Sequence, residues 1–278
     1  MGKLERQALP IILTIITFFG LVGILYLFIV ALNLFPHSEP ILLALRKRDI
    51  LVGLTIYLKT SVDFALFIGN LMASNPGWKN RIAIELGTAL GNAFGTFVVL
   101  AIWSFFKEVP ILMVLMVTLA SFVLLGMAQD SIEEFYETLK TGTFVKKIFA
   151  VFLKGLVMIN SLTSPLLSKI VPHMKITKIK PMPFISLSIF SISIPFILGL
   201  DDFAGYIPLF SVINVFGFAI GVFLGHMILN IALFISPNKT VSLVRTPLVL
   251  IIGGMAFIAI AFWGFYEALH ILKELVIR

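Results

Sequence analysis

The chain has 278 residues, of which 59% are hydrophobic and only 13% are charged, and its mean hydropathy is +1.08. Because soluble domains are only about 45–50% apolar, this composition excludes a soluble globular protein and predicts a polytopic membrane protein. The absence of cysteine excludes disulfides, thiolate metal sites and cysteine nucleophiles. A net charge of +7 is ordinary for a membrane protein with basic cytoplasmic loops and does not indicate nucleic acid as a partner.

Apolar segments long enough to cross a bilayer as helices, which takes about 20 residues, recur along the chain. The first is longer than the apolar part of a signal peptide and lacks a small-residue cleavage site, so we expect a retained helix. The seven predicted spans are 9–35, 50–74, 82–106, 109–129, 183–207, 211–235 and 247–270. We expect them to form one all-α transmembrane domain over 1–278.

A three-part pattern occurs twice among these spans. Each copy begins with Asp-Phe-Ala, at Asp63 and again at Asp202, and continues with a ladder of three glycines spaced four residues apart. About a tenth of one such triplet is expected by chance at ordinary glycine content, so two copies indicate a duplicated three-helix unit. The first ladder is Gly87, Gly91 and Gly95, the second is Gly217, Gly221 and Gly225, and the third helices begin at Pro110 and Pro247 and reach Gly126 and Gly264.

An odd number of spans per unit requires the second copy to insert upside down. We therefore predict two inverted repeats, 50–129 and 183–270, preceded by an extra helix at 9–35. Inverted repeats with matching acids are typical of secondary transporters. Glycine ladders allow close approach of helix backbones, and we expect each ladder to pack on the acid-bearing helix of its own repeat.

A polar insert, 130–180, separates the repeats and contains eight lysines. Because basic loops stay cytoplasmic, it predicts an N-terminus inside the cell, in the cytoplasmic membrane of a prokaryote. Within the insert, 148–171 is apolar but interrupted by polar residues. We favour an amphipathic helix at the membrane interface; the alternative is an eighth span, which would make the repeats parallel.

Asp63 lies near the middle of the second span, and Asp201 and Asp202 lie near the end of the fifth. Carboxylates in hydrocarbon cost roughly 3 kcal/mol or more, face the bundle interior and usually mark an ion pathway. Lys59 lies one turn before Asp63, so a structural ion pair is the alternative. The matching acid in the second repeat favours function.

Other polar groups extend the predicted site. Prolines and glycines between Pro195 and Pro208 are expected to interrupt the helix and free carbonyls for a cation. Asn70 could supply an amide oxygen or cap its helix, and Glu85 could join the site or lie solvated at the interface. His226 could carry protons, although a hydrogen-bonded structural histidine is favoured. The predicted metal ligands are Asp63, Asp202, Asp201, Asn70 and Glu85, and the predicted coupling residues are Lys59 and His226.

The segments "VDFALFIG" at 62–69 and "GLDDFAGYIPLF" at 199–210 resemble the lysine-exporter superfamily, in particular its cadmium-resistance and TerC-like branches. The resemblance covers roughly 50–129 and 183–270. It implies small exporters or cation/proton antiporters built from two inverted three-helix repeats, whose paired acids bind the ion. Carried over position by position, it implicates Asp63, Asp201 and Asp202.

The sequence thus predicts a secondary transporter that exports a divalent or other hard cation in exchange for protons. Oxygen ligands without thiols suit Mg, Ca or Mn better than a soft metal, and protons compete with metal for the same carboxylates. Lys59 could replace the cation in the empty state. The expected partners are the metal ion, protons and membrane lipid, with no resident cofactor, and the interpretation allows a homodimer.

Two alternatives remain open. One is an amino-acid or small organic solute exporter of the same fold, in which helix ends would hold a carboxylate. The other is a non-transporting membrane partner or assembly factor, whose lysine-rich insert recruits a protein or anionic lipid. An enzyme is not expected, because no nucleophile–base pair is visible and the four histidines are widely scattered.

Overall fold

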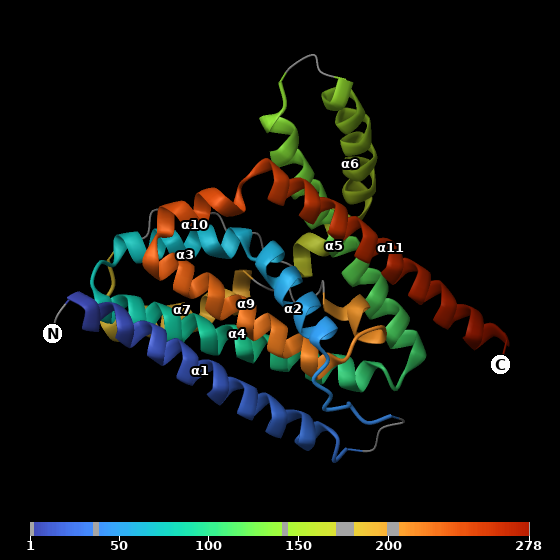
Figure 1. The fold of residues 1–278 in the computed structure, drawn as a ribbon. Helices are drawn as coiled ribbons and strands as arrows, with labels where there is room; N and C mark the ends of the chain where they lie inside the picture. The colour runs from blue at the N-terminus through green and yellow to red at the C-terminus, as the bar shows by residue number, and fades with distance from the viewer. Residues whose placement is uncertain (1–2, 36–38, 141–143, 171–180, 199–205, 278) are drawn as a thin grey trace. The chain divides into compact units, whose positions relative to one another are not determined.

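The computed structural model describes residues 3–35, 39–140, 144–170, 181–198 and 206–277 (Figure 1). These residues are helical apart from short connections and include no strand, as predicted. Five of the described helices are long and apolar enough to cross a membrane, and one bent pair makes a sixth when it is counted as a single span. The architecture is that of an all-helical, polytopic membrane protein.

Three of the helices begin at prolines, whose missing N–H is not needed in the first turn, and the described part of the fifth predicted span, 183–207, contains only a short apolar helix, Phe184–Pro195. In chain order the helices are α1 (Lys3–Leu32), α2 (Lys47–Thr60), α3 (Val62–Ser74), α4 (Trp78–Phe106), α5 (Pro110–Thr138), α6 (Phe144–Ile170), α7 (Phe184–Leu198), the 3-10 helix η1 (Ile207–Ser211), α9 (Val215–Ile235), α10 (Pro237–Val244) and α11 (Pro247–Ile277).

The second predicted span, 50–74, is not one helix. It consists of α2 and α3, which are bent by 63° at Ser61. At this bend the Thr60 hydroxyl and the Ser61 amide both donate to the carbonyl oxygen of Tyr57, at 3.2 and 3.0 Å. We expected an interruption only in the fifth span, where α7 ends at Leu198 and residues 199–205 lie outside the described part of the chain.

The chain divides into two compact units, and each takes helices from both predicted repeats. The first unit comprises Met1–Ala101, Met174–Leu200 and Ile213–Ser242, and the second comprises Ile102–His173, Asp201–Val212 and Leu243–Arg278. The first unit therefore holds α1 to α3, most of α4, α7 and α9. The second unit holds α5, α6, η1 and α11.

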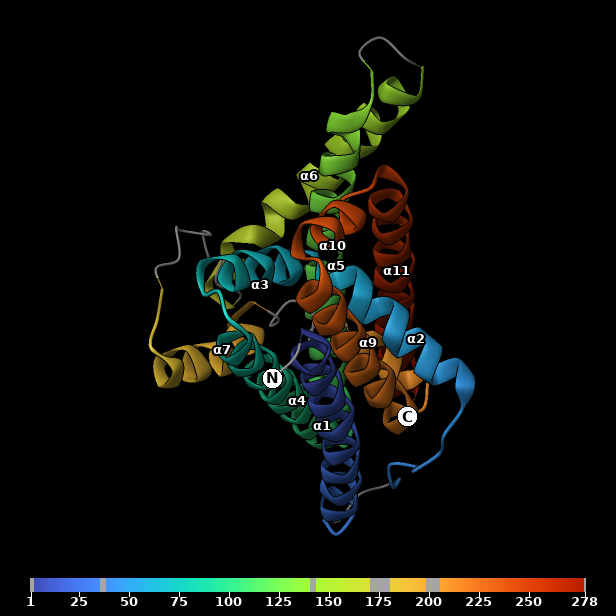
Figure 2. The ribbon, with the colours of Figure 1, turned by 60° about the vertical axis from the view of Figure 1, so that its left-hand side comes forward.

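In the first unit, α2 and α9 lie side by side (Figures 1 and 2). The contacts run from Gly217 beside Asp49 to Gly225 beside Tyr57, so the two helices run parallel. At the middle of this contact, a Cβ atom added to Gly221 would overlap the carbonyl oxygen of Ile50. The second glycine ladder thus allows the backbones of α2 and α9 to touch.

The first glycine ladder packs in the same way on α7. Gly87 lies beside Ser191, and a Cβ atom added to Gly91 would overlap the carbonyl oxygen of Ile192, so α4 and α7 also run parallel. The prediction that each ladder packs within its own repeat was wrong for these glycines. Each ladder packs on the first helix of the other repeat. Glycine spacing identifies a helix face that allows close packing, but it does not identify the helix that packs there.

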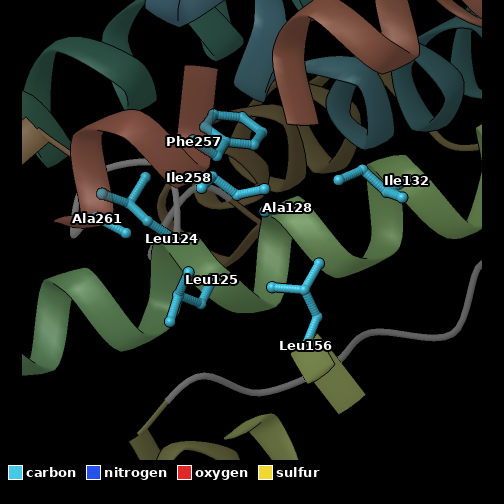
Figure 3. Close-up of a cluster of buried hydrophobic side chains, with 8 residues drawn as sticks. All are labelled: Leu124, Leu125, Ala128, Ile132, Leu156, Phe257, Ile258 and Ala261. Carbon is cyan, nitrogen blue, oxygen red and sulfur yellow. The ribbon is translucent and has the colours of Figure 1, made fainter. Parts of the chain in front are cut away.

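In the second unit, α5 and α11 run antiparallel. Gly254, early in α11, lies beside Ile132, late in α5, whereas Gly264 lies beside Ser121. Their shared core also includes one residue of α6 (Figure 3). The buried side chains are Leu124, Leu125, Ala128 and Ile132 from α5, Leu156 from α6, and Phe257, Ile258 and Ala261 from α11.

Residues 148–170 of the segment predicted at 148–171 belong to α6, which packs along α5; the amide nitrogen of Asn160 donates to Oε1 of Gln129 at 2.6 Å. Among the described helices, α6 is not one that meets the length and hydropathy expected of a span. The helix directions agree with this, because an eighth span would reverse every later helix. It would then make α2 and α9 antiparallel and α5 and α11 parallel, opposite to what the contacts show.

Candidate functional site

The first unit contains a hydrogen-bonded group of buried polar side chains beside the α2–α3 bend. We call it the polar network; its members are Tyr57 from α2, Glu85 and Thr88 from α4, and His226 and Asn230 from α9. None of these residues is more than 3% exposed. Burying polar side chains among apolar helices costs free energy, so such groups usually mark a functional site.

The ladder of α9 positions the network. A Cβ atom on Gly225 would lie only 2.9 Å from Cδ1 of Tyr57, so glycine is what lets the tyrosine ring reach α9. The next residue, His226, places Nδ1 2.5 Å from Oη of Tyr57. Asn230 follows four residues later on the same helix face, and its amide nitrogen lies 3.0 Å from Nε2 of His226.

Asn230 joins α9 to α4. Its amide nitrogen also lies 3.2 Å from Oγ1 of Thr88 and 3.5 Å from the backbone oxygen of Glu85. With this amide donating to Nε2, the neutral imidazole of His226 carries its hydrogen on Nδ1 and donates it to Tyr57. Both ring nitrogens therefore have neutral partners, which is the arrangement of the favoured structural histidine. A coupling role for His226 stays a prediction.

Glu85 is buried, with only 3% of its surface exposed, so the expectation of a solvated carboxylate at the interface was wrong. Neither of its carboxylate oxygens has a hydrogen-bond partner among the described residues. Arg81, one turn earlier on α4, donates instead to the backbone oxygen of Phe234 at 2.9 Å. The side-chain oxygen of Asn230 also lacks a donor. These three oxygen atoms are the least satisfied part of the network.

Three predicted ligands cannot be located from their side chains. Asp201 and Asp202 lie outside the described residues, as does the side chain of Asp63. The backbone of Asp63 belongs to the first turn of α3. The next residue, Phe64, has its ring centroid 5.4 Å from that of His226. The first turn of α3 therefore lies beside the polar network.

Two other predicted residues are placed differently from what we expected. Asn70 lies on an exposed side of α3, away from the buried groups, and does not cap the helix, which continues to Ser74. Lys59 is 9% exposed and belongs to the last turn of α2. Because the bend separates Lys59 from Asp63, their spacing of four residues no longer places them on one continuous helix face.

The described residues contain no group of three or more histidine or acidic side chains that could hold a metal ion. The network instead offers one carboxylate, one imidazole, hydroxyls and an amide. Sequence reasoning missed Tyr57, Thr88 and Asn230. The spacing of Asn230 four residues after His226, inside an apolar span, is a signal that could have identified it. Comparisons with protein-family models, with curated proteins and with solved structures give no match.

Proposed function

We propose that this protein is a secondary transporter that exports a hard cation in exchange for protons. The observation that carries the proposal is the bent α2–α3 pair beside the buried polar network. Interrupted helices inside a membrane are tolerated where they are buried in protein or line a cavity. Transporters place substrate and ion sites at such interruptions, where freed backbone groups and buried side chains meet.

The helix directions support the inverted repeat on which this proposal depends. Two copies of a three-helix unit in opposite orientation require α2 parallel to α9, α4 parallel to α7, and α5 antiparallel to α11, as the glycine contacts have them. Hydrogen bonds in the first unit also join helix ends that the predicted topology puts on one side. These bonds join Asn75 Oδ1 to Met182 N (2.8 Å), Arg81 Nη1 to Phe234 O (2.9 Å) and Asn214 Nδ2 to Leu42 O (2.7 Å).

Asp63 and Asp202 remain the proposed ligands of the exported ion, with Asp201 beside them. A chain without cysteine offers oxygen ligands, which suit Mg, Ca or Mn. The proposed location is the cytoplasmic membrane of a prokaryote, with the N-terminus inside, on the strength of the lysine-rich segment between the repeats.

Purified protein in liposomes tests the proposal. With an acidic lumen and a more alkaline exterior, an antiporter accumulates labelled Ca²⁺ or Mn²⁺ while protons leave. We expect such uptake to disappear when the pH gradient is collapsed with a protonophore. Accumulation of a labelled amino acid instead would favour the organic-solute exporter. Absence of gradient-driven uptake of any cation would favour the non-transporting partner.

A further inference from the structure

We propose that Glu85 and Asn230 form a second cation site, separate from the acids of the repeat motif, which binds a monovalent alkali cation. The site lies where α4 meets α9 in the first unit. Only its role in the cycle, as a second bound ion beside the exported cation and the protons, rests on the proposed function. Binding of the alkali cation itself does not depend on transport.

The first argument is the set of acceptors without donors. Both carboxylate oxygens of Glu85 and the side-chain oxygen of Asn230 are buried and lack any hydrogen-bond partner among the described residues. The amide nitrogen of Asn230 lies 3.5 Å from the backbone oxygen of Glu85, so these residues face each other across the helix contact. Buried acceptors without a donor are costly, and a bound cation would remove that cost.

The second argument separates a metal cation from a proton. A protonated carboxyl still leaves its second oxygen as an acceptor, and neither oxygen of Glu85 has a hydrogen-bond partner among the described residues. A metal ion holds each oxygen at about 2.4 Å and keeps the oxygens apart from one another. A cation can therefore satisfy both carboxylate oxygens of Glu85, whereas a proton satisfies only one.

The third argument concerns charge. Glu85 is the one acid of the polar network; the other members are neutral, and no ion pair among the described residues includes Glu85. A monovalent cation is neutralised by a single carboxylate, whereas a divalent cation would leave a buried positive charge. Other charged residues of the surrounding helices include Asp49 and Lys59 on α2, Asp63 in the first turn of α3, and Lys79 and Arg81 on α4, of which Arg81 bonds to Phe234.

His226 does not supply the positive charge in place of the proposed cation. Its Nε2 accepts from Asn230 and its Nδ1 contacts Tyr57, so a second proton on the ring would break the bond to Asn230. The same bonds hold the Asn230 amide in place with its oxygen unpaired. His226 and Tyr57 are therefore positioning residues for the cation site.

The test is thermal unfolding of the purified full-length protein in detergent, with NaCl or KCl against N-methylglucamine chloride at equal ionic strength. We expect an alkali cation to raise the unfolding midpoint of the wild type in a saturable way. In Glu85→Gln, which keeps the shape of the side chain, the apparent affinity should fall at least about tenfold. The control Glu137→Gln removes an exposed acid at the end of α5 and should respond as the wild type does.

A second variant keeps the inference falsifiable if Glu85→Gln unfolds. Asn230→Asp adds a second carboxylate to the site and should shift the stabilising ion from Na⁺ or K⁺ to Ca²⁺. Equal midpoints of the wild type in all three salts, or an alkali effect that Glu85→Gln retains, would overturn the inference. Because unfolding needs no flux, a protein that binds Na⁺ or K⁺ but moves no cation would refute the proposed function and leave this site standing.

Discussion

The hydroxyl oxygen of Tyr57 lies 2.5 Å from Nδ1 of His226, although the two residues are 169 positions apart in the chain. This bond joins the end of α2, one turn before the bend at Ser61, to the glycine-ladder helix of the other predicted repeat. The bond is possible because Gly225 has no side chain to hold the tyrosine ring away. The close helix contact and the polar network are thus one arrangement, and a change in either should affect the other.

Replacing Gly221 by alanine should destabilise the protein. The added methyl group would overlap the carbonyl oxygen of Ile50, and overpacking of this kind costs about 1–3 kcal/mol. This outweighs the gain of up to about 1 kcal/mol from alanine's higher helix propensity. Thermal unfolding in detergent measures the difference. Gly126→Ala is the matched control, because nothing lies within 4 Å of its added Cβ, and it should leave the midpoint unchanged or raised. Equal shifts in the two variants would show that the ladder is not a tight contact.

Removing the hydroxyl of Tyr57 should leave the buried His226 nitrogen without its partner. Tyr57→Phe is therefore expected to lower the free energy of unfolding by about 1–3 kcal/mol. Tyr26, which is 48% exposed on α1, provides the control, since Tyr26→Phe removes a hydroxyl that is not part of the network. Denaturant unfolding of the three proteins would decide the matter. If Tyr57→Phe were as stable as Tyr26→Phe, the bond to His226 would contribute nothing to the fold.

The predicted orientation can be tested directly, because the chain contains no cysteine and single cysteines can be introduced without further changes. Lys47, exposed at the start of α2, is predicted to lie outside the cell, and Glu137, exposed at the end of α5, inside. A membrane-impermeant maleimide applied to intact cells should label Lys47→Cys at once and Glu137→Cys only after permeabilisation. The reverse pattern would place the N-terminus outside. Labelling of both variants in intact cells would contradict the predicted alternation of spans.

Much of the fold follows from local properties that a sequence displays. Apolar length predicted the spans, and Pro110 and Pro247 marked the starts of α5 and α11 because proline fits a first helical turn. The bend at Ser61 was missed because the two helices together pass as one apolar span in a hydropathy average. The end of α5 was placed too early, at 129, because its last turns are acidic, yet the helix continues to Thr138 alongside α6.

The site depends on partners distant in the chain, and these were harder to predict. His226 and Glu85 were identified as intramembrane polar groups, but their surroundings depend on which helices meet. The contact of α9 with α2 supplied Tyr57, and its contact with α4 supplied Thr88. Asn70 was chosen for its residue type alone, and the direction of its helix face excludes it from the network. The roles of Asp63, Asp201 and Asp202 stay predictions.

The central claim, that cation export is exchanged for protons at the proposed ligands Asp63 and Asp202, is tested most directly by following pH inside liposomes. Protein is reconstituted with a pH-sensitive dye in the lumen, and Mn²⁺ or Ca²⁺ is added outside. The account predicts that the lumen becomes more alkaline as cations enter and protons leave, and that Asp63→Asn, folded to the same degree by thermal unfolding, produces no pH change. Cation entry by the wild type without any change in lumenal pH, or a full response from Asp63→Asn, would contradict it.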